Sequence, residues 1–193
     1  MKLAVVVLAG GEGSRMGGDK PLRMLGGKRL IDRAAEFARS WSEVIAVAVR
    51  NPGQAGAVDL ECIVDEEGID GPLAGLAAAL RFAQDAGCQG VLTIPADMPF
   101  LPPELGQRLA AGIGGAGAAI AGSGGELHPV CALWKVSASG TLLNYLATGR
   151  RSLRGFAEAV GLQRVDWPVD PVDPFFNINS PADLATAERL LHG

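Results

Sequence analysis

The stretch LAVVVLAGGEGSRMGGDK, residues 3–20, decides the fold. Its first six residues are all apolar, which is typical of a short strand buried on both faces of a sheet. The remainder contains five glycines, and because glycine costs about 1 kcal/mol relative to alanine in a helix interior, this part is predicted to be a loop. The loop carries two cations, Arg15 and Lys20. The sequence therefore predicts a first strand that ends in a glycine-rich, cationic loop.

Apolar runs of strand length alternate with segments of helical period along the rest of the chain. This alternation indicates β-α-β units. The predicted strands cover residues 3–8, 44–49, 62–64, 90–95, 118–121, 130–135 and 163–167. The predicted helices cover residues 30–41, 72–86, 103–113, 137–147 and 153–160, and a last one begins at Pro181 after the capping residue Ser180. We expect an α/β three-layer sandwich with a mostly parallel, Rossmann-like twisted sheet, helices on both faces, and a single domain over residues 1–193.

Composition and charge exclude several classes of protein. The 193 residues carry a formal net charge of −4, which leaves no general basic field for nucleic acid or an anionic membrane. No apolar run approaches the roughly 20 residues of a membrane-spanning helix, and the short apolar start lacks the cleavage site of a signal peptide. Cys62, Cys88 and Cys131 are far apart without CxxC spacing, which argues against a disulfide framework or a zinc site. We therefore expect a cytoplasmic protein with reduced core thiols and neither nucleic acid nor membrane as a partner.

The glycine-rich loop is predicted to bind an anion. A loop after the first strand of an open α/β sheet is a favoured ligand site, and glycines let backbone N–H groups surround phosphate oxygens. The dinucleotide pattern G-x-G-x-x-G fails because Met16 stands where the third glycine is needed. The P-loop pattern fails because Asp19 precedes Lys20 and Pro21 replaces the hydroxyl residue. A plain turn with solvated charges stays open as the alternative.

A third pattern fits the loop and four later segments. These are LAGGEGSRMGGDKPL from Leu8, GPLAG from Gly71, PADMPFL from Pro95, HPV from His128 and FFNINSPADL from Phe175. In this order they resemble the motifs of the molybdenum cofactor guanylyltransferase family, across nearly the whole chain. The resemblance implies a nucleotide-diphospho-sugar transferase-like fold. It also implies an enzyme that transfers GMP from GTP to the terminal phosphate of molybdopterin or molybdenum cofactor and releases pyrophosphate.

The resemblance further implies a nucleotide site in the N-terminal half. Its residues are Leu8, Ala9, Gly10, Gly11, Lys20, Asn51, Gly71, Gly75 and Asp97. Arg15 and Lys20 are the expected catalytic cations, because phosphoryl transfer depends on positioning and electrostatics. Asp97 is the third catalytic residue and the metal ligand. It follows an apolar strand, so its carboxylate reaches the sheet edge where Mg²⁺, with Mn²⁺ as the alternative, can bridge it to phosphates. Without the family pattern, Asp97 and Asn51 are ordinary turn residues.

Acceptor-binding residues are expected in the C-terminal half. They are Arg150, Arg151, Arg154, Asn177 and Asn179. Guanidinium groups bind phosphate through bidentate hydrogen bonds, and the two asparagines alternate along an extended segment, so they face the same way. A solvated helix start and a polar edge are the respective alternatives. The sequence leaves open the roles of four further residues: Asp65, Glu66, Glu67 and His128.

Gly10 bears on the choice of nucleotide. Cytidylyl relatives tend to carry LAAG where this chain has LAGG, and glycine leaves room for a purine, although one methyl group discriminates by only about 1 to 3 kcal/mol. GTP is therefore the expected donor, with a cytidylyltransferase or a sugar-phosphate nucleotidyltransferase as the nearest alternatives. A non-catalytic GTP-binding adaptor is an alternative of another class, and the presence of Arg15, Lys20 and Asp97 together argues against it. Cofactor-delivery proteins are further expected partners.

Overall fold

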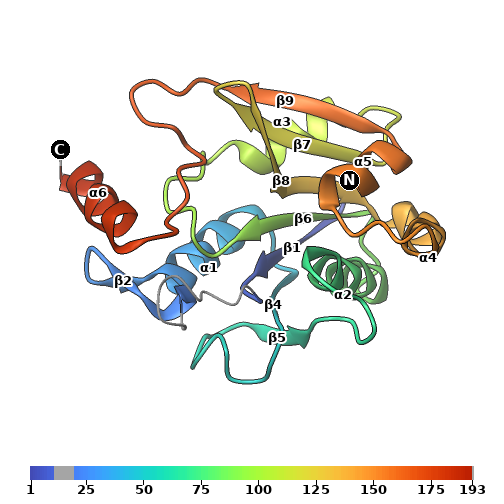
Figure 1. Ribbon diagram of the computed structural model, residues 1–193, viewed down its shortest axis with the longest axis horizontal. Helices are drawn as coiled ribbons and strands as arrows, with labels where there is room; N and C mark the ends of the chain where they lie inside the picture. The colour runs from blue at the N-terminus through green and yellow to red at the C-terminus, as the bar shows by residue number, and fades with distance from the viewer. Residues whose placement is uncertain (11–19, 193) are drawn as a thin grey trace.

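A computed structural model of the protein describes residues 1–10 and 20–192. Its centre is a seven-stranded sheet in the order β5-β4-β1-β6-β8-β7-β9 (Figure 1). The strands are β1 (Leu3–Leu8), β4 (Ile45–Val49), β5 (Glu61–Val64), β6 (Gly90–Pro95), β7 (Ala118–Ser123), β8 (Glu126–Lys135) and β9 (Leu162–Trp167). Strand β8 runs antiparallel to both of its neighbours, whereas the other pairings in this sheet are parallel. The predicted mostly parallel sheet is confirmed.

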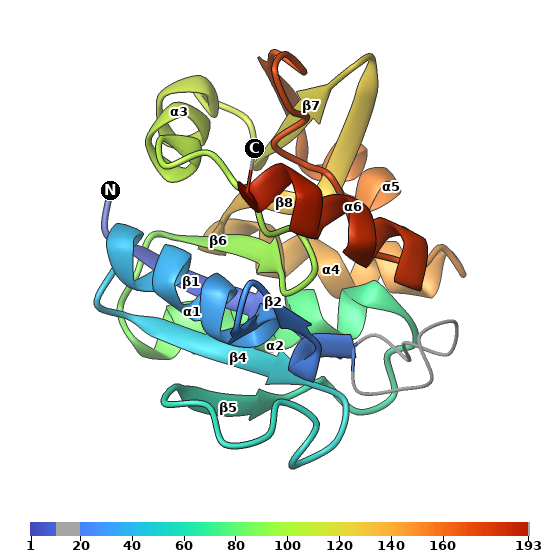
Figure 2. The ribbon, with the colours of Figure 1, turned by 90° about the vertical axis from the view of Figure 1, so that its left-hand side faces the viewer.

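Helices cover both faces of the sheet (Figures 1 and 2). They are α1 (Leu30–Trp41), α2 (Pro72–Asp85), α3 (Leu105–Gly112), α4 (Ser139–Ala147) and α5 (Leu153–Val160). Helices α1 and α3 share one hydrophobic core with Val5 and Val7 of β1, and α2, α4 and α5 share another with Ala4 and Val6. Successive side chains of a strand point to opposite faces, so β1 is buried on both. The predicted three layers are confirmed.

Strand β8 is longer than predicted. It begins at Glu126, four residues before the predicted start, and its first residues pair with β7 across a tight hairpin. His128 and Pro129 interrupt the apolar pattern here, which hid this part of the strand. The pairing shifts between Ile120 and Ala121 on β7. An irregularity of this kind tolerates proline, which has no N–H to donate to the ladder.

A short hairpin and the last helix pack together beside the sheet (Figure 1). These elements are β2 (Met24–Leu25), β3 (Lys28–Arg29) and α6 (Pro181–His192). Leu25 and Ala187 are buried in a third small core with Leu30 and Ile178. The start of α6 confirms the predicted cap at Ser180. The hairpin was not predicted, because two-residue strands are too short to show a periodic pattern.

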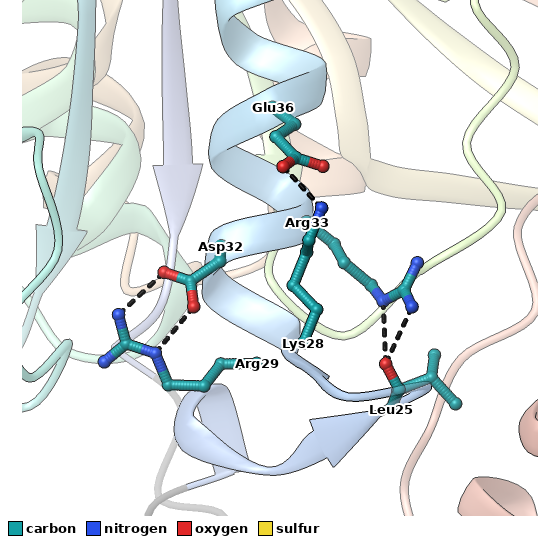
Figure 3. A network of polar contacts seen from close by, with 6 residues as sticks. All are labelled: Leu25, Lys28, Arg29, Asp32, Arg33 and Glu36. Carbon is teal, nitrogen blue, oxygen red and sulfur yellow. Dashed lines mark hydrogen bonds and ion pairs between the residues drawn. The ribbon is translucent and has the colours of Figure 1, made fainter.

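Polar contacts fasten this hairpin to α1 (Figure 3). The Arg33 guanidinium donates from Nε and Nη2 to the carbonyl oxygen of Leu25, at 3.1 and 2.7 Å. Arg29 forms a two-bond ion pair with Asp32, at 2.6 and 2.7 Å, in the first turn of α1, where a carboxylate is favoured. The 3-10 turn η2 (Lys20–Leu22) also lies against α1. Both chain segments that follow the glycine-rich loop are therefore held against one helix.

Two smaller expectations are corrected. The three cysteines are free, but only Cys88 and Cys131 are buried; Cys62 is exposed because it lies on β5, the edge strand of the sheet. The third helix begins at Leu105 rather than at residue 103, because a turn precedes it. No helix among residues 1–10 and 20–192 combines the length and apolar composition that crossing a membrane requires.

Candidate active site

A cavity of about 320 Å³ opens beside the carboxyl ends of β1, β4 and β6. These strands meet where the chain order in the sheet reverses, since β1 lies between β4 and β6. Loops that leave neighbouring strands in opposite directions open a crevice at such a point. The fold therefore creates this cavity where the glycine-rich loop begins.

Backbone hydrogen bonds continue the sheet pairing to the cavity floor. The Ala9 N–H donates to the Ala48 carbonyl at 2.8 Å, and the Ala96 N–H donates to the Leu8 carbonyl at 3.4 Å. The chain leaves the sheet at the next residues, Gly10 and Asp97, and both line the cavity. The ends of β1 and β6 thus hold these two residues in place.

Three segments that are far apart in the sequence meet at one end of the cavity. The Lys20 ammonium forms an ion pair with Asp97 Oδ2. It also donates to Asn179 Oδ1 at 2.8 Å, across 159 residues of sequence. The side chains of Lys20 and Asp97 are only 15% and 20% exposed, so their interaction is screened less than that of a surface pair. A cation and an anion are therefore held together where a charged ligand can reach both.

Two oxygen atoms at this cavity are buried and have no partner among the described residues: Asp97 Oδ1 and Asn177 Oδ1. Buried polar atoms normally have hydrogen-bond partners, so such atoms require an explanation. Carboxylate and amide oxygens are ligands that Mg²⁺ prefers, usually one or two from the protein together with phosphates and water. Among the described residues, no three His, Cys, Asp or Glu side chains gather in a way that could hold a metal ion, at this cavity or elsewhere, so the protein atoms here would supply only part of the coordination. The donor set fits a divalent cation that is shared with a phosphate ligand.

Asp65 directly follows β5 and lines the cavity between Gly10 and Gly75. A Cβ atom at Gly10 would lie 2.8 Å from Asp65 Oδ2, and one at Gly75 would lie 3.3 Å from Asp65 Oδ1. Both glycines therefore make room for this carboxylate. Burial raises the pKa of the Asp65 carboxyl, and the charge of Arg50 opposes the rise. The absence of a side chain at Gly10 thus has a more specific reason than the predicted room for a purine.

Comparisons with known proteins assign the family. The MobA-like NTP transferase domain matches residues 5–164. The molybdenum cofactor guanylyltransferase of Cereibacter sphaeroides is 41% identical over 99% of this chain and 98% of its own length. That of Rhodopseudomonas palustris is 40% identical over 96% and 90%. The chain belongs to the molybdenum cofactor guanylyltransferase family. In agreement, molybdopterin-guanine dinucleotide biosynthesis protein A from Archaeoglobus fulgidus has a similar crystal structure, with a TM-score of 0.78 and 30% identity over 100% of this chain and 99% of that one.

Membership of the guanylyltransferase family makes the chain a nucleotidyltransferase. Most residues that the sequence motifs suggested for the nucleotide lie at one cavity. Those that line it are Leu8, Ala9, Gly10, Lys20, Gly71, Gly75 and Asp97. Asn177, which was expected to bind the acceptor, lines the same cavity. Asn179 joins them through its hydrogen bond with Lys20. Gly11 and Arg15 lie outside the described residues.

Besides Asn179, four of the suggested residues that the structure describes do not line the cavity. Asn51 is exposed in the turn after β4. Arg150, Arg151 and Arg154 are exposed around the start of α5. The Arg154 Nε donates to Glu158 Oε1 at 3.1 Å, with Arg150 at 4.0 Å from the same carboxylate. Arg151 donates to backbone carbonyl groups. The arginines thus lie together only because they are close in sequence. Their partners are also nearby in sequence.

Sequence reasoning did not single out Arg50, a charged residue that lines the cavity, and it left the role of Asp65 open. Arg50 and Asp65 line the cavity, and each comes directly after a predicted strand. A polar residue at the end of a buried strand is the same signal that pointed to Asp97. The other acidic residues of the loop lie elsewhere: Glu66 pairs with Arg81, and Glu67 is exposed.

His128 has a structural environment on β8. The Ser123 hydroxyl donates to Asp173 Oδ1 at 2.9 Å and lies 2.8 Å from His128 Nε2. Because the hydroxyl proton points to Asp173, the Nε2–H of His128 donates to Ser123 Oγ. The imidazole also stacks on Phe175, with ring centroids 4.6 Å apart. These contacts anchor the beginning of the segment that carries Asn177 and Asn179.

Proposed function

We propose that the protein transfers GMP from GTP to the terminal phosphate of molybdopterin or of the molybdenum cofactor and releases pyrophosphate. The observation that carries this proposal is the ion pair of Lys20 with Asp97 at the cavity that Asn177 also lines. The names of the relatives, guanylyltransferases that match nearly the full chain, support it. We further propose that residues 1–193 act as one domain, with the nucleotide bound by the N-terminal half and the acceptor by the C-terminal half.

The guanine base is proposed to bind against Asp65. Guanine presents two adjacent donors, N1–H and the N2 amino group, which match the two acceptor oxygens of a carboxylate. Cytosine presents one amino donor next to acceptor atoms, so it makes a single favourable contact there. Gly10 and Gly75 leave the space that the carboxylate needs. Asp65 is therefore the proposed reason for a preference for GTP over CTP.

Asp97 and Asn177 are proposed as the residues that would hold a divalent ion for the nucleotide. Mg²⁺ is the proposed ion and Mn²⁺ an alternative, since both accept oxygen ligands. When bound, the ion neutralises phosphate charge and orients the phosphates. The support is the pair of buried oxygen atoms that lack partners among the described residues.

In the proposed reaction, an oxygen of the acceptor phosphate attacks the α-phosphorus of GTP. The new P–O bond forms as the bond to the bridging oxygen breaks, and that oxygen leaves with pyrophosphate. The Lys20 ammonium, 2.8 Å from Asn179 Oδ1, would hydrogen-bond to phosphate oxygens on which charge builds up. Arg15 is proposed to assist. Catalysis then consists of positioning and electrostatic stabilisation, without a covalent enzyme intermediate.

The test is to incubate the protein with molybdopterin, Mg²⁺ and either GTP or CTP. Mass analysis of the pterin should reveal the GMP adduct with GTP and far less CMP adduct with CTP, together with pyrophosphate in an amount equal to the adduct. Removal of divalent ions with a chelator should stop both products. Failure to form the GMP adduct with either Mg²⁺ or Mn²⁺ would refute the proposed function.

A further inference from the structure

The start of α6 is closed by two reciprocal hydrogen bonds. The Asp183 N–H donates to the capping hydroxyl of Ser180 at 3.2 Å. In return, Asp183 Oδ2 accepts the backbone N–H of Asn179 at 2.9 Å. This resembles a capping box, in which the third helical residue reaches back to the chain before the helix. Here the residue that it holds is Asn179, a partner of Lys20.

The contacts continue from Asn179 into the active site. Asn179 Oδ1 accepts a hydrogen bond from the Lys20 ammonium, which also pairs with Asp97. The backbone hydrogen bond from Asn179 lowers the pKa of the Asp183 carboxyl most, hydrogen bonds from Ser180 add to this, and the charge of Lys20 contributes last. Asp183 is thus connected to the reacting end of the cavity through a single intermediate residue.

Among the described residues, other contacts of this segment do not replace the support from Asp183. Ile178 is buried, and its N–H donates to the Asp97 carbonyl at 3.0 Å, so the chain is fixed on the side that precedes Asn179. Asn179 itself is exposed, so packing does not fix its orientation. The backbone at Asn179 is held by the hydrogen bond of the Ile178 N–H on one side and by that of its own N–H to Asp183 on the other.

We propose that Asp183 is a positioning residue for guanylyl transfer. By holding the Asn179 backbone, it keeps Asn179 Oδ1 where it shares the Lys20 ammonium with Asp97. Without that share, Asp97 alone holds the ammonium, and the direction in which the ammonium faces the nucleotide phosphates is less well fixed. The inference rests on the proposed function and names a residue that acts on the reaction without touching the substrate.

The experiment compares Asp183→Ala with a matched control, Asp32→Ala. Both aspartates are the third residue of a helix and accept hydrogen bonds in its first turn, but Asp32 pairs with Arg29 away from the cavity (Figure 3). We expect Asp183→Ala to lower kcat about tenfold with KM for GTP changed less than twofold, and Asp32→Ala to leave both near the wild-type values. Asp183→Asn keeps an acceptor oxygen at the same place and should restore most of kcat.

A double-mutant cycle separates positioning from general destabilisation. If Asp183 acts through Asn179, Asp183→Ala should have no further effect on kcat in an Asn179→Ala background, because interacting residues are not additive. Full additivity would overturn the inference, and so would equal kcat values for Asp183→Ala and Asp32→Ala. If circular dichroism finds Asp183→Ala unfolded, Asp183→Ser replaces it, since its hydroxyl is too short to reach the Asn179 N–H. A wild-type protein that forms no GMP adduct would overturn the proposed function as well, whereas an active wild type with an unaffected Asp183→Ala overturns only this inference.

Discussion

Two charged clusters of this protein are assembled in opposite ways. Lys20, Asp97 and Asn179 come from distant parts of the chain, and two of the three side chains are largely buried. The arginine cluster, Arg150 with Arg151 and Arg154, comes from five consecutive positions and is exposed. Its members already pair with Glu158 or with backbone carbonyls.

The difference lies in the cost of forming each cluster. Bringing a cation and an anion together in a partly buried place requires the fold to offset their desolvation, and it leaves Asp97 Oδ1 without a partner among the described residues. Local surface pairs cost little and contribute little. Convergence from distant segments, combined with oxygen atoms that lack partners among the described residues, is therefore a stronger reason to propose a functional site than closeness in sequence.

The largest effect is expected from a substitution in the cluster of Lys20, Asp97 and Asn179. Asp97→Ala removes the proposed metal ligand and the counterion of Lys20, so we expect kcat to fall roughly 10³-fold, measured by pyrophosphate release. Asp59→Ala is the matched control, because it removes an exposed aspartate that pairs with Arg39. A wild-type rate for Asp97→Ala would contradict the metal and charge roles.

The next largest effect is expected on recognition of the guanine base, whereas Asp97 is proposed to act at the phosphates of GTP. Asp65→Asn replaces one acceptor oxygen by a donor, which opposes the guanine donors. The preference for GTP over CTP, measured as the ratio of kcat/KM values, should fall by roughly thirtyfold, or about 2 kcal/mol. Glu66→Gln provides the control, since Glu66 is the next residue but pairs with Arg81. An unchanged ratio in Asp65→Asn would exclude base recognition by this carboxylate.

A smaller effect is expected at the arginine cluster. Replacing Arg150 and Arg154 together by alanine should raise KM for molybdopterin about fivefold, equivalent to about 1 kcal/mol, because exposed guanidinium groups gain little from one phosphate. The KM for GTP and the kcat should stay at their wild-type values. Steady-state kinetics at low and high salt check this, and the effect should shrink at high salt. If KM for the pterin does not change, the cluster is only a solvated surface.

The smallest expected effect is on stability and involves His128. Burial lowers the pKa of this imidazole below its ordinary value of 6.5, against the opposing charge of Asp173. The folded protein therefore binds this proton less readily than the unfolded chain, so stability declines as pH falls below about 6.5. His128→Gln keeps a donor for Ser123 but does not titrate. The Tm of the variant should decline less than that of the wild type between pH 7.5 and 5.5; equal declines would contradict the assignment.

Much of the fold could be predicted because buried strands and helix faces appear in the sequence as regular patterns of apolar residues. The predicted ranges of β1 and β6 match the structure at both ends, since both strands are almost entirely apolar and lie at the centre of the sheet. The hairpin β2–β3 and the beginning of β8 were missed. The former is too short for any period, and the latter contains His128 and Pro129, which break the apolar alternation.

The candidate site could be predicted in part. The rule that polar residues at strand ends meet at one sheet edge pointed to Asp97, and it applies equally to Asp65 and Arg50. The contact between Asn179 and Lys20 left no such signal, because it depends on how α6 packs against the β2 hairpin. Equally, no local pattern separates Asp65, which lines the cavity, from the paired Glu66 beside it.

The sequence by itself determined the alternation of strands and helices, the order of the motifs and the cationic loop after the first strand, because periodicity and backbone preferences act over a few residues. Only the tertiary structure decided which charges meet. Packing of α6 and the reversal of strand order bring residues 159 positions apart into one hydrogen bond. Contacts of this kind depend on the shape of the whole core and on the balance between burial and pairing, which no short stretch of sequence contains.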